Sequence, residues 1–557
     1  MAIKVKDRLI SFINPPYFTA DLILATLFIL FFLILGTASM IGRSLTYDEP
    51  AHFQYGINIL DGNSARFDDS KMPVSALNAI PQKVVSYLPQ GNTIKNWLQK
   101  YQTARLMTLI FSALVALLGH FWSRKLYGIL PALVTLFLYV FDPNIIAHSQ
   151  LITTDIYAMG ATTLVFFCLW RFAHHRNWLN GIIYSFALGF SLVAKYSTVA
   201  LLPLSVVCLI FYDLPKLRND YHVNASGTLK RSLRRYAFYI ILASVISILV
   251  INVAFLFNRT FTPFGNYKFR STLFQSIQAR LPMINNLVIP TPYPYLEGLD
   301  WVIQREQTGE GYGSPYMLGM VNPRGQGFLG YYFVASLFKV PIASQVIILL
   351  SLIVYVVDKK RRAHFLLDEQ FLLVPVIFYT LYFNFFYDTQ IGIRHYLIVF
   401  PLLYIFVGNL FIHWKQFSKW QKALFYLSAV YLAISVLSYF PYYITYFNEL
   451  VLDKRTTYKY LSDSNLDYGQ DRYQLDAYLE KHPGTLTDVD RPQAGNFIIA
   501  ANKLTGVALG ITSDPTQYEW LRKNFTPLDT VANYYFIFKI SPEEIKRLCQ
   551  TTDYCNK

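Results

Sequence analysis

Long runs of apolar residues alternate with shorter polar segments along most of this chain, and residues 21–41 form the first run. A run of about 20 apolar residues is long enough to cross a bilayer as a helix. The pattern recurs and predicts about eleven transmembrane helices. We expect nine of them near residues 21–41, 102–122, 129–146, 156–172, 236–257, 328–357, 370–386, 393–412 and 423–444. The other two form a tight pair, one on each side of residues 195–197.

Two of the polar segments, residues 42–100 and 258–327, are long, and we expect both to be outer loops. Lys and Arg cluster instead in short segments between the apolar runs, such as Arg124-Lys125. Cytoplasmic loops are enriched in these residues, so the basic N-terminal tail is predicted to be cytoplasmic. Five successive basic loops then fall on the cytoplasmic side, and the polar stretch 445–557 falls outside.

The C-terminal stretch 445–557 is predicted to be a small extracytoplasmic α/β domain, following a transmembrane catalytic domain over residues 1–444. Its pattern favours helices at 471–481, 519–524 and 542–550 and buried strands at 497–500 and 534–538. Cys549 and Cys555 lie close together in this stretch, where an oxidising compartment would allow a disulfide.

Composition supports a membrane protein and excludes other classes. The chain is 54% hydrophobic and only 15% charged, whereas soluble domains carry roughly a quarter charged residues. The net charge of +15 would suggest nucleic acid in a soluble protein. Here the basic residues set topology and face anionic lipid, and no basic stripe interleaved with aromatic residues suggests a nucleic-acid partner. No cysteine spacing indicates a zinc site.

Two adjacent carboxylates, Asp48 and Glu49, follow the first apolar run directly. Charged groups beside a membrane are costly, so membrane proteins usually keep them for a substrate, an ion or a proton. The alternative is structural: Asp48 would cap a helix whose first turn contains Glu49 and Pro50.

Further polar residues gather on the same predicted outer side of the membrane. A carboxylate there can take a proton from an acceptor hydroxyl, and cations can stabilise a phosphate leaving group. No glycine-rich nucleotide loop is present, so a cytosolic nucleotide donor is not expected. Structural alternatives are helix capping by Asp155, snorkelling of the lysines and pairing of Arg394 and His395 with Asp388. The candidates are Asp155, His148, Lys195, Lys339, Arg394 and His395.

Several motifs resemble the protein O-mannosyltransferase family, glycosyltransferase family 39, in its bacterial branch. Thr46–His52 resembles the Asp-Glu motif of the family's first outer loop, and His148–Asp155 resembles its entry to a later helix. The other similar segments are Tyr316–Gly319, Gly330–Phe333, Lys339–Pro341, Ile391–Tyr396, Tyr446–Glu449 and Asp463–Gln470.

This resemblance implies a GT-C fold and an enzyme of the plasma or inner membrane. Such enzymes transfer a sugar from a polyprenyl-phosphate carrier to an acceptor hydroxyl at the outer face. The resemblance implies Asp48 as catalytic base, Glu49 as its neighbour and Asp155 in the active site. The substrate-binding candidates Lys195, Arg394, His395, Lys339 and His148 rest on their shared side of the membrane. We expect a single inverting displacement.

The acceptor stays open between a glycan, a lipid and a protein, because the 258–327 loop is too short for the inserted β-trefoil of the eukaryotic enzymes. No cofactor is required by the sequence, although Asp48 and His52, one helical turn apart, leave a divalent metal ion open. Two other classes compete with an enzyme. A transporter or flippase predicts charges at mid-depth in the membrane, and a scaffold protein would use residues 445–557 to bind partners.

Overall fold

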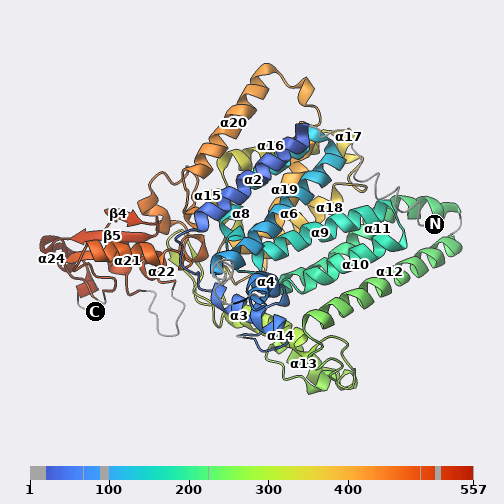
Figure 1. Ribbon diagram of the computed structural model, residues 1–557, viewed down its shortest axis with the longest axis horizontal. Coiled ribbons are helices and arrows are strands. Elements are labelled where there is room, and N and C mark those ends of the chain that lie inside the picture. The colour runs from blue at the N-terminus through green and yellow to red at the C-terminus, as the bar shows by residue number, and fades with distance from the viewer. Residues whose placement is uncertain are drawn as a thin grey trace.

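A bundle of long helices dominates the computed structural model, with short helices and loops at one end and a small C-terminal unit beside them (Figure 1). The structure describes residues 20–555 apart from residue 67, residue 88, residues 90–99, residue 224, residue 490 and residues 508–515. The basic tail with Lys4, Lys6 and Arg8 lies outside the described residues.

Each of the eleven expected segments is helical. Seven helical spans among the described residues are long and apolar enough to cross a membrane, and two bent helix pairs raise the number to nine. Two shorter apolar helices, α10 (Trp178–Leu192) and α18 (Gln370–Phe385), occupy the remaining segments. A multi-pass membrane protein is therefore confirmed, while the number of eleven transmembrane helices stays a prediction. The seven spans contain α2 (Ala20–Met40), α6 (Tyr101–Tyr127), α9 (Asp155–His174), η2 (Tyr196–Ala200) with α11 (Leu201–Val223), α12 (Ala225–Ala254), η5 (Ile393–Val399) with α19 (Phe400–Val407) and η6 (Gly408–Phe411), and α20 (Lys419–Leu437).

Two segments expected to be single helices are broken. α7 (Ile129–Val140) and α8 (Pro143–Ser149) meet at 62°, and α15 (Tyr331–Lys339) and α16 (Ile342–Val357) meet at 120°. Pro341 explains the second break, because the residue before a proline avoids helical geometry, and Val340 is extended. The prediction of one continuous helix over 328–357 was therefore wrong.

The two long polar segments fold into short helices at one end of the bundle. Residues 42–100 contain α3 (Glu49–Leu60), η1 (Pro73–Ser75) and α4 (Ala76–Val85). Residues 258–327 contain η3 (Phe264–Asn266), α13 (Thr272–Arg280), η4 (Pro282–Ile284), α14 (Tyr293–Thr308) and the paired strands β1 (Tyr316–Met317) and β2 (Met320–Val321). The opposite end of the bundle carries basic groups such as α17 (Lys359–Arg362) and the end of α6.

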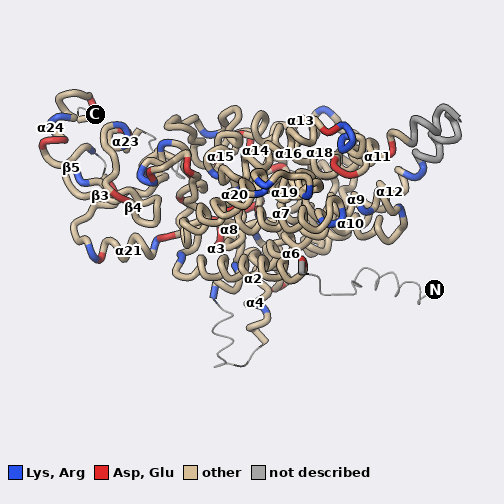
Figure 2. Tube along the Cα trace, turned by 90° about the horizontal axis from the view of Figure 1, so that it is seen from above, with Lys and Arg blue, Asp and Glu red and all other residues tan. Residues whose placement is uncertain are grey.

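The C-terminal unit contains a three-stranded antiparallel sheet in the order β3-β5-β4. All five of its predicted elements are confirmed, and Cys549 and Cys555 form a disulfide. The surface of this unit carries both signs of charge (Figure 2), as a water-exposed domain does. Its elements are η9 (Lys454–Lys459), η10 (Asp463–Asn465), α21 (Arg472–Lys481), β3 (Gly495–Ala500), α22 (Ala501–Thr505), α23 (Glu519–Asn524), β4 (Asp529–Val531), β5 (Tyr535–Ile540), α24 (Pro542–Thr551) and η11 (Asp553–Cys555).

One apolar core joins the helical bundle to the C-terminal unit. The connection runs through residues 443–471, which pack against the bundle. Tyr446 and Leu466 in this stretch are fully buried, in the same core as Tyr139 and Phe400 of the bundle. The C-terminal unit is thereby held beside the end of the bundle that carries the short helices of residues 42–100 and 258–327.

Candidate active site

Arg394 brings together two carboxylates that lie far apart in the sequence. Its Nη1 atom is 2.9 Å from Asp48 Oδ2 and 3.7 Å from Asp155 Oδ2. Arg394 lies in η5, which begins directly after Gly392. Gly392 has a φ of +128° and packs so closely against Ser464 that a Cβ atom would not fit. Asn465 Oδ1 accepts a hydrogen bond from the Ile393 amide at 2.9 Å, which fixes the start of η5.

Asp48 stands at the start of α3, but its carboxylate does not cap the helix. Instead it accepts hydrogen bonds from Arg394 and from the hydroxyl of Tyr468. The Asp48 side chain is 24% exposed, so one side of this carboxylate stays accessible. Burial raises the pKa of Asp48, but Arg394 and Lys71 outweigh it and hold the pKa well below its usual range. The carboxylate is therefore ionised at neutral pH.

Asp155 forms the second arm of the cluster. It is the first residue of α9, and its Oδ1 atom lies 2.5 Å from Lys195 Nζ. Lys195 precedes η2, so this ion pair joins the starts of two helices. The Asp155 side chain is only 3% exposed, while that of Lys195 is 24% exposed. Lys195 is therefore held in an ion pair with Asp155 and does not extend toward the membrane interface. Arg394 pairs with Asp48 and Asp155 rather than with Asp388.

Glu49 shares none of the hydrogen-bond partners of its neighbour Asp48. Its fully buried carboxylate pairs with Arg105 of α6, at 2.8 Å from Nε and 2.6 Å from Nη2. It also accepts hydrogen bonds from the Thr46 amide and hydroxyl and from the Ile152 amide. Five donors fill the roughly four lone-pair sites of a carboxylate. Since no site is left for an acceptor, the geometry favours a positioning role for Glu49 over the predicted catalytic one.

Lys339 also has a structural environment. Its Nζ atom donates to the carbonyl oxygens of Ile444 at 2.8 Å and Asn465 at 2.6 Å, and the side chain is buried. Asn448 donates to the carbonyls of Leu337 and Val340 at the break between α15 and α16. Together these contacts attach residues 443–471 to the bundle, so the geometry does not favour Lys339 as a substrate ligand.

The two candidate histidines lie at the edge of the cluster. His395 Nδ1 lies 3.0 Å from the Tyr387 hydroxyl. His148 on α8 is buried, and its Nδ1 atom has no hydrogen-bond partner among the described residues. Both rings contribute to the electrostatic environment of Asp155. The structure therefore brings together Asp48, Asp155, Lys195 and Arg394, with His395 and His148 beside them.

Three side chains around the candidate residues were missed by the sequence analysis. The ring of Tyr468 lies 4.5 Å from the Arg394 guanidinium, and its hydroxyl bonds to Asp48. Lys71 is buried and lies 3.3 Å from Asp68. Arg105 holds Glu49. Tyr468 could have been identified from its place inside the Asp463–Gln470 motif. Arg105 could have been identified as a charged residue at the start of an apolar run.

A metal site of the kind left open at Asp48 and His52 finds little support in the side chains around it. Within the described residues, no group of three or more His, Cys, Asp and Glu side chains is placed to hold an ion. His52 Nδ1 lies 3.2 Å from the Ser75 hydroxyl. Burial and the positive charge of Lys71 lower the pKa of His52 to about 3, so its ring is neutral. The nearest partners of Asp48 are the cation of Arg394 and the hydroxyl of Tyr468.

Residues 71–264 match the family model for dolichyl-phosphate-mannose-protein mannosyltransferase. The resemblance to this family is confirmed. The predictions of a glycosyltransferase enzyme and of a helical multi-pass membrane fold with a small C-terminal α/β unit are confirmed, whereas the GT-C type of that fold stays a prediction. The matched range includes Asp155 and Lys195, whereas Asp48 and Arg394 lie outside it. Among curated proteins, none matches the sequence.

Two solved structures are similar to this chain at low sequence identity. ArnT from Cupriavidus metallidurans, bound to undecaprenyl phosphate, is 15% identical with a TM-score of 0.47, over 75% of this chain and 68% of that chain. The archaeal oligosaccharyltransferase AglB from Archaeoglobus fulgidus, in complex with an inhibitory peptide and a dolichol-phosphate, is 11% identical with a TM-score of 0.41. That second match covers 75% of this chain and 55% of AglB.

Proposed function

We propose that this protein transfers a sugar from a polyprenyl-phosphate donor to an acceptor hydroxyl at the outer face of the membrane, with Asp48 as general base. One observation carries the proposal. A single guanidinium, that of Arg394, holds two carboxylates, and only the Asp48 carboxylate keeps an exposed side. Asp155 is enclosed by cations, and Glu49 has no free acceptor site.

The reaction follows from the roles of these groups. The acceptor hydroxyl gives its proton to Asp48, and its oxygen forms a bond to the anomeric carbon of the donor sugar. The bond from that carbon to the phosphate oxygen breaks, and polyprenyl phosphate leaves with the electron pair. Attack from the face opposite the phosphate inverts the anomeric centre. A phosphate leaves as an anion, so the site needs cations near it more than it needs a proton donor.

Lys195 and Arg394 are the cations placed to hold the phosphate. Lys195 is 24% exposed, and both reach Asp155, which fixes their positions. Asp155 is therefore proposed as a positioning residue for the phosphate site. His395 and His148 lie within electrostatic range of Lys195 and Arg394 and are proposed as further polar groups of the phosphate site.

Donor binding would also activate the base. While Arg394 and Tyr468 bond to Asp48, its low pKa makes it a weak proton acceptor. A phosphate that attracts Arg394 weakens this pairing and raises the basicity of Asp48. The Tyr468 hydroxyl occupies one lone pair of Asp48 Oδ2, the position that an acceptor hydroxyl would take. In this mechanism the acceptor replaces the tyrosine hydroxyl after the donor has bound.

We infer the orientation from the two unlike ends of the bundle. Basic groups at α17 and at the end of α6 support a cytoplasmic assignment for their end, and the Asp48 cluster lies at the other end. The C-terminal unit is then extracytoplasmic, after a transmembrane catalytic domain ending near residue 444, in a plasma or inner membrane. A glycan, a lipid or a protein is the acceptor. Transport is less well supported, because the cluster lies at one end of the bundle.

A transfer assay tests this proposal. The full chain in lipid nanodiscs is incubated with a panel of radiolabelled polyprenyl-phosphate sugars and a membrane extract as acceptor. Asp48→Asn is expected to abolish transfer while donor binding is kept. Asp61→Asn is a matched control, because Asp61 lies at the other end of α3 in a solvent-exposed pair with Lys83. Failure of every donor with a folded protein would overturn the proposal.

A further inference from the structure

The hairpin of residues 256–290, at the end of the bundle near the candidate active site, has an unusual composition. It contains no Asp or Glu, and it contains many large apolar residues. A basic segment without acids beside a membrane is the composition that anionic lipid headgroups attract. Arg270 of the hairpin lies 3.3 Å from Asp69, a residue of the 42–100 segment, and the Arg270 side chain remains 51% exposed. The basic residues of the hairpin are Arg259, Lys268, Arg270 and Arg280.

The hairpin is a packed unit rather than a loose loop. Phe264, Tyr267 and Phe269 form a small core with Tyr293 of α14, separate from the main core. Two arms pair along the chain, with the Phe264 amide 2.9 Å from the Leu287 carbonyl and the Gly265 amide 2.8 Å from the Asn285 carbonyl. The side chains on its outer surface therefore keep fixed positions.

Large apolar side chains nevertheless remain uncovered on this unit. Met283 in η4 is 82% exposed, Phe261 on one arm is 66% exposed, and Leu287 on the other arm is 58% exposed. Phe257, which leads into the hairpin, is 56% exposed. The small core of the hairpin does not include any of these four side chains. A surface of this kind on a packed unit marks an interaction site.

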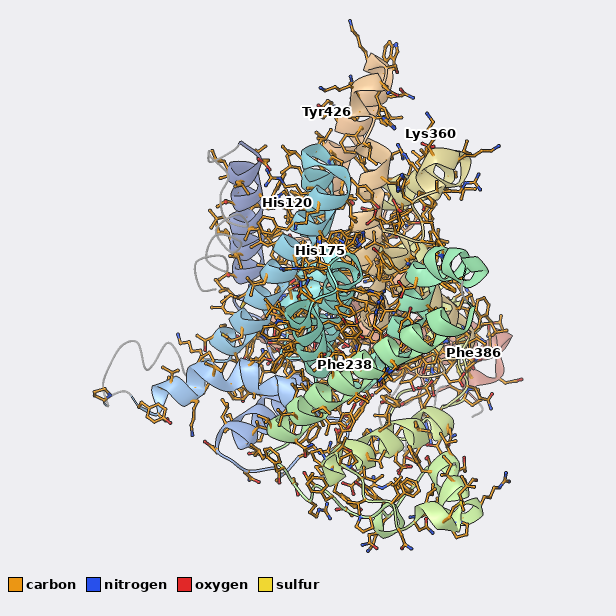
Figure 3. The ribbon with its side chains drawn as sticks, turned by 90° about the vertical axis from the view of Figure 1, so that its right-hand side faces the viewer. His120, His175, Phe238, Lys360, Phe386 and Tyr426 are labelled. Carbon is orange, nitrogen blue, oxygen red and sulfur yellow. A yellow bond between two sulfur atoms is a disulfide. The ribbon has the colours of Figure 1, made fainter. Side chains whose placement is uncertain are left out.

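The hairpin continues directly from a helix with an apolar, uncovered surface. Most of the apolar span in α12 is not covered by the rest of the protein, and Leu249 and Val253 near its end are 50% and 56% exposed. The hairpin with α13 lies beside the outer end of α12 and extends sideways from the bundle (Figure 1). Figure 3 shows it projecting below α12, the helix that carries Phe238. Its apolar surface thus lies near the depth at which α12 leaves the membrane.

We propose that the 256–290 hairpin is an interfacial membrane anchor that binds anionic phospholipid on the leaflet next to the candidate active site. Its apolar side chains enter the boundary between headgroups and acyl chains, and its basic side chains contact the headgroup phosphates. Amphipathic, acid-free segments bind membrane interfaces by this combination of apolar burial and charge attraction. This inference does not depend on the proposed transfer reaction.

Depth-dependent quenching tests the proposal on the full chain. Met283→Cys and, separately, Phe261→Cys are labelled with an environment-sensitive fluorophore. Labelling is selective because Cys168 and Cys208 are buried and Cys549 and Cys555 are paired. The labelled proteins are placed in nanodiscs of phosphatidylcholine with or without phosphatidylglycerol. A matched control is Leu528→Cys, since Leu528 is 61% exposed on the C-terminal unit.

We expect blue-shifted emission at positions 283 and 261 and several-fold stronger quenching by nitroxide-labelled lipid than at position 528. Phosphatidylglycerol should increase the quenching, and Arg280→Gln should reduce that increase. Water-like emission at 283 and 261 in both lipids would overturn the proposal. Shielded emission without lipid quenching would overturn it as well, because it would indicate a protein partner or a second copy of this chain.

Discussion

Replacement of Glu49 by glutamine should damage the fold rather than the chemistry. The carboxylate is fully buried and accepts five hydrogen bonds, two of them from Arg105, whose side chain is 3% exposed. An amide would place a donor nitrogen against these donors and leave the arginine charge without a counter-charge. Breaking a buried ion pair in this way costs about 3–5 kcal/mol.

Intrinsic tryptophan fluorescence of the protein in detergent measures this loss as a lower unfolding midpoint. The control Asp61→Asn removes an exposed ion pair, whose contribution is about 1 kcal/mol or less. In the double variant Glu49→Gln/Arg105→Gln, the orphaned charge is gone, so part of the lost stability should return. A Glu49→Gln variant that unfolds like the wild type yet loses transfer would refute the reasoning and make Glu49 a chemical participant.

Three further predictions concern the site and its supporting segment. Lys195→Met should weaken donor binding about 10-fold to 100-fold, as expected for one charge-assisted contact of about 1.5–3 kcal/mol; unchanged binding would remove Lys195 from the phosphate site. Tyr468→Phe removes a hydrogen bond that lowers the pKa of Asp48, so the acid limb of the pH–rate profile should move to higher pH. Burial raises the pKa of Asp463 from 3.8 to about 7, so the folded state binds this proton more tightly than the unfolded state. The protonated Asp463 carboxyl therefore contributes to stability fully below pH 3.8, and this contribution is lost as the pH rises through about 7. Asparagine tolerates the positive φ at this position, so Asp463→Asn should fold and should flatten the fall of the unfolding midpoint across this pH range. An unchanged dependence of the midpoint on pH would contradict the raised pKa of Asp463.

The helices could be predicted because apolar length is a local signal. The shared side of Asp48, Asp155, Lys195 and Arg394 was also predictable, since the predicted topology places all four at the same end of the helical bundle. Their contacts were not predictable. Asp48 and Arg394 are 346 residues apart, and nothing near either residue indicates which charge it will meet.

The roles of adjacent residues show the same limit. Asp48 and Glu49 have the same chemistry in the sequence, and only their partners separate them. Arg105 and the Ile152 amide, which enclose Glu49, lie 56 and 103 residues away. The short helices α3, α4, α13 and α14 were also missed, because brief amphipathic turns give a weaker pattern than a span of about 20 apolar residues.

Transfer by wild type and Asp48→Asn, measured side by side in nanodiscs, tests the central claim most directly. We predict that the variant binds the polyprenyl-phosphate sugar as the wild type does, unfolds at a similar temperature and transfers no sugar. Transfer that survives in Asp48→Asn would contradict the assignment of Asp48 as the base and would move that role elsewhere in the cluster, first to Asp155.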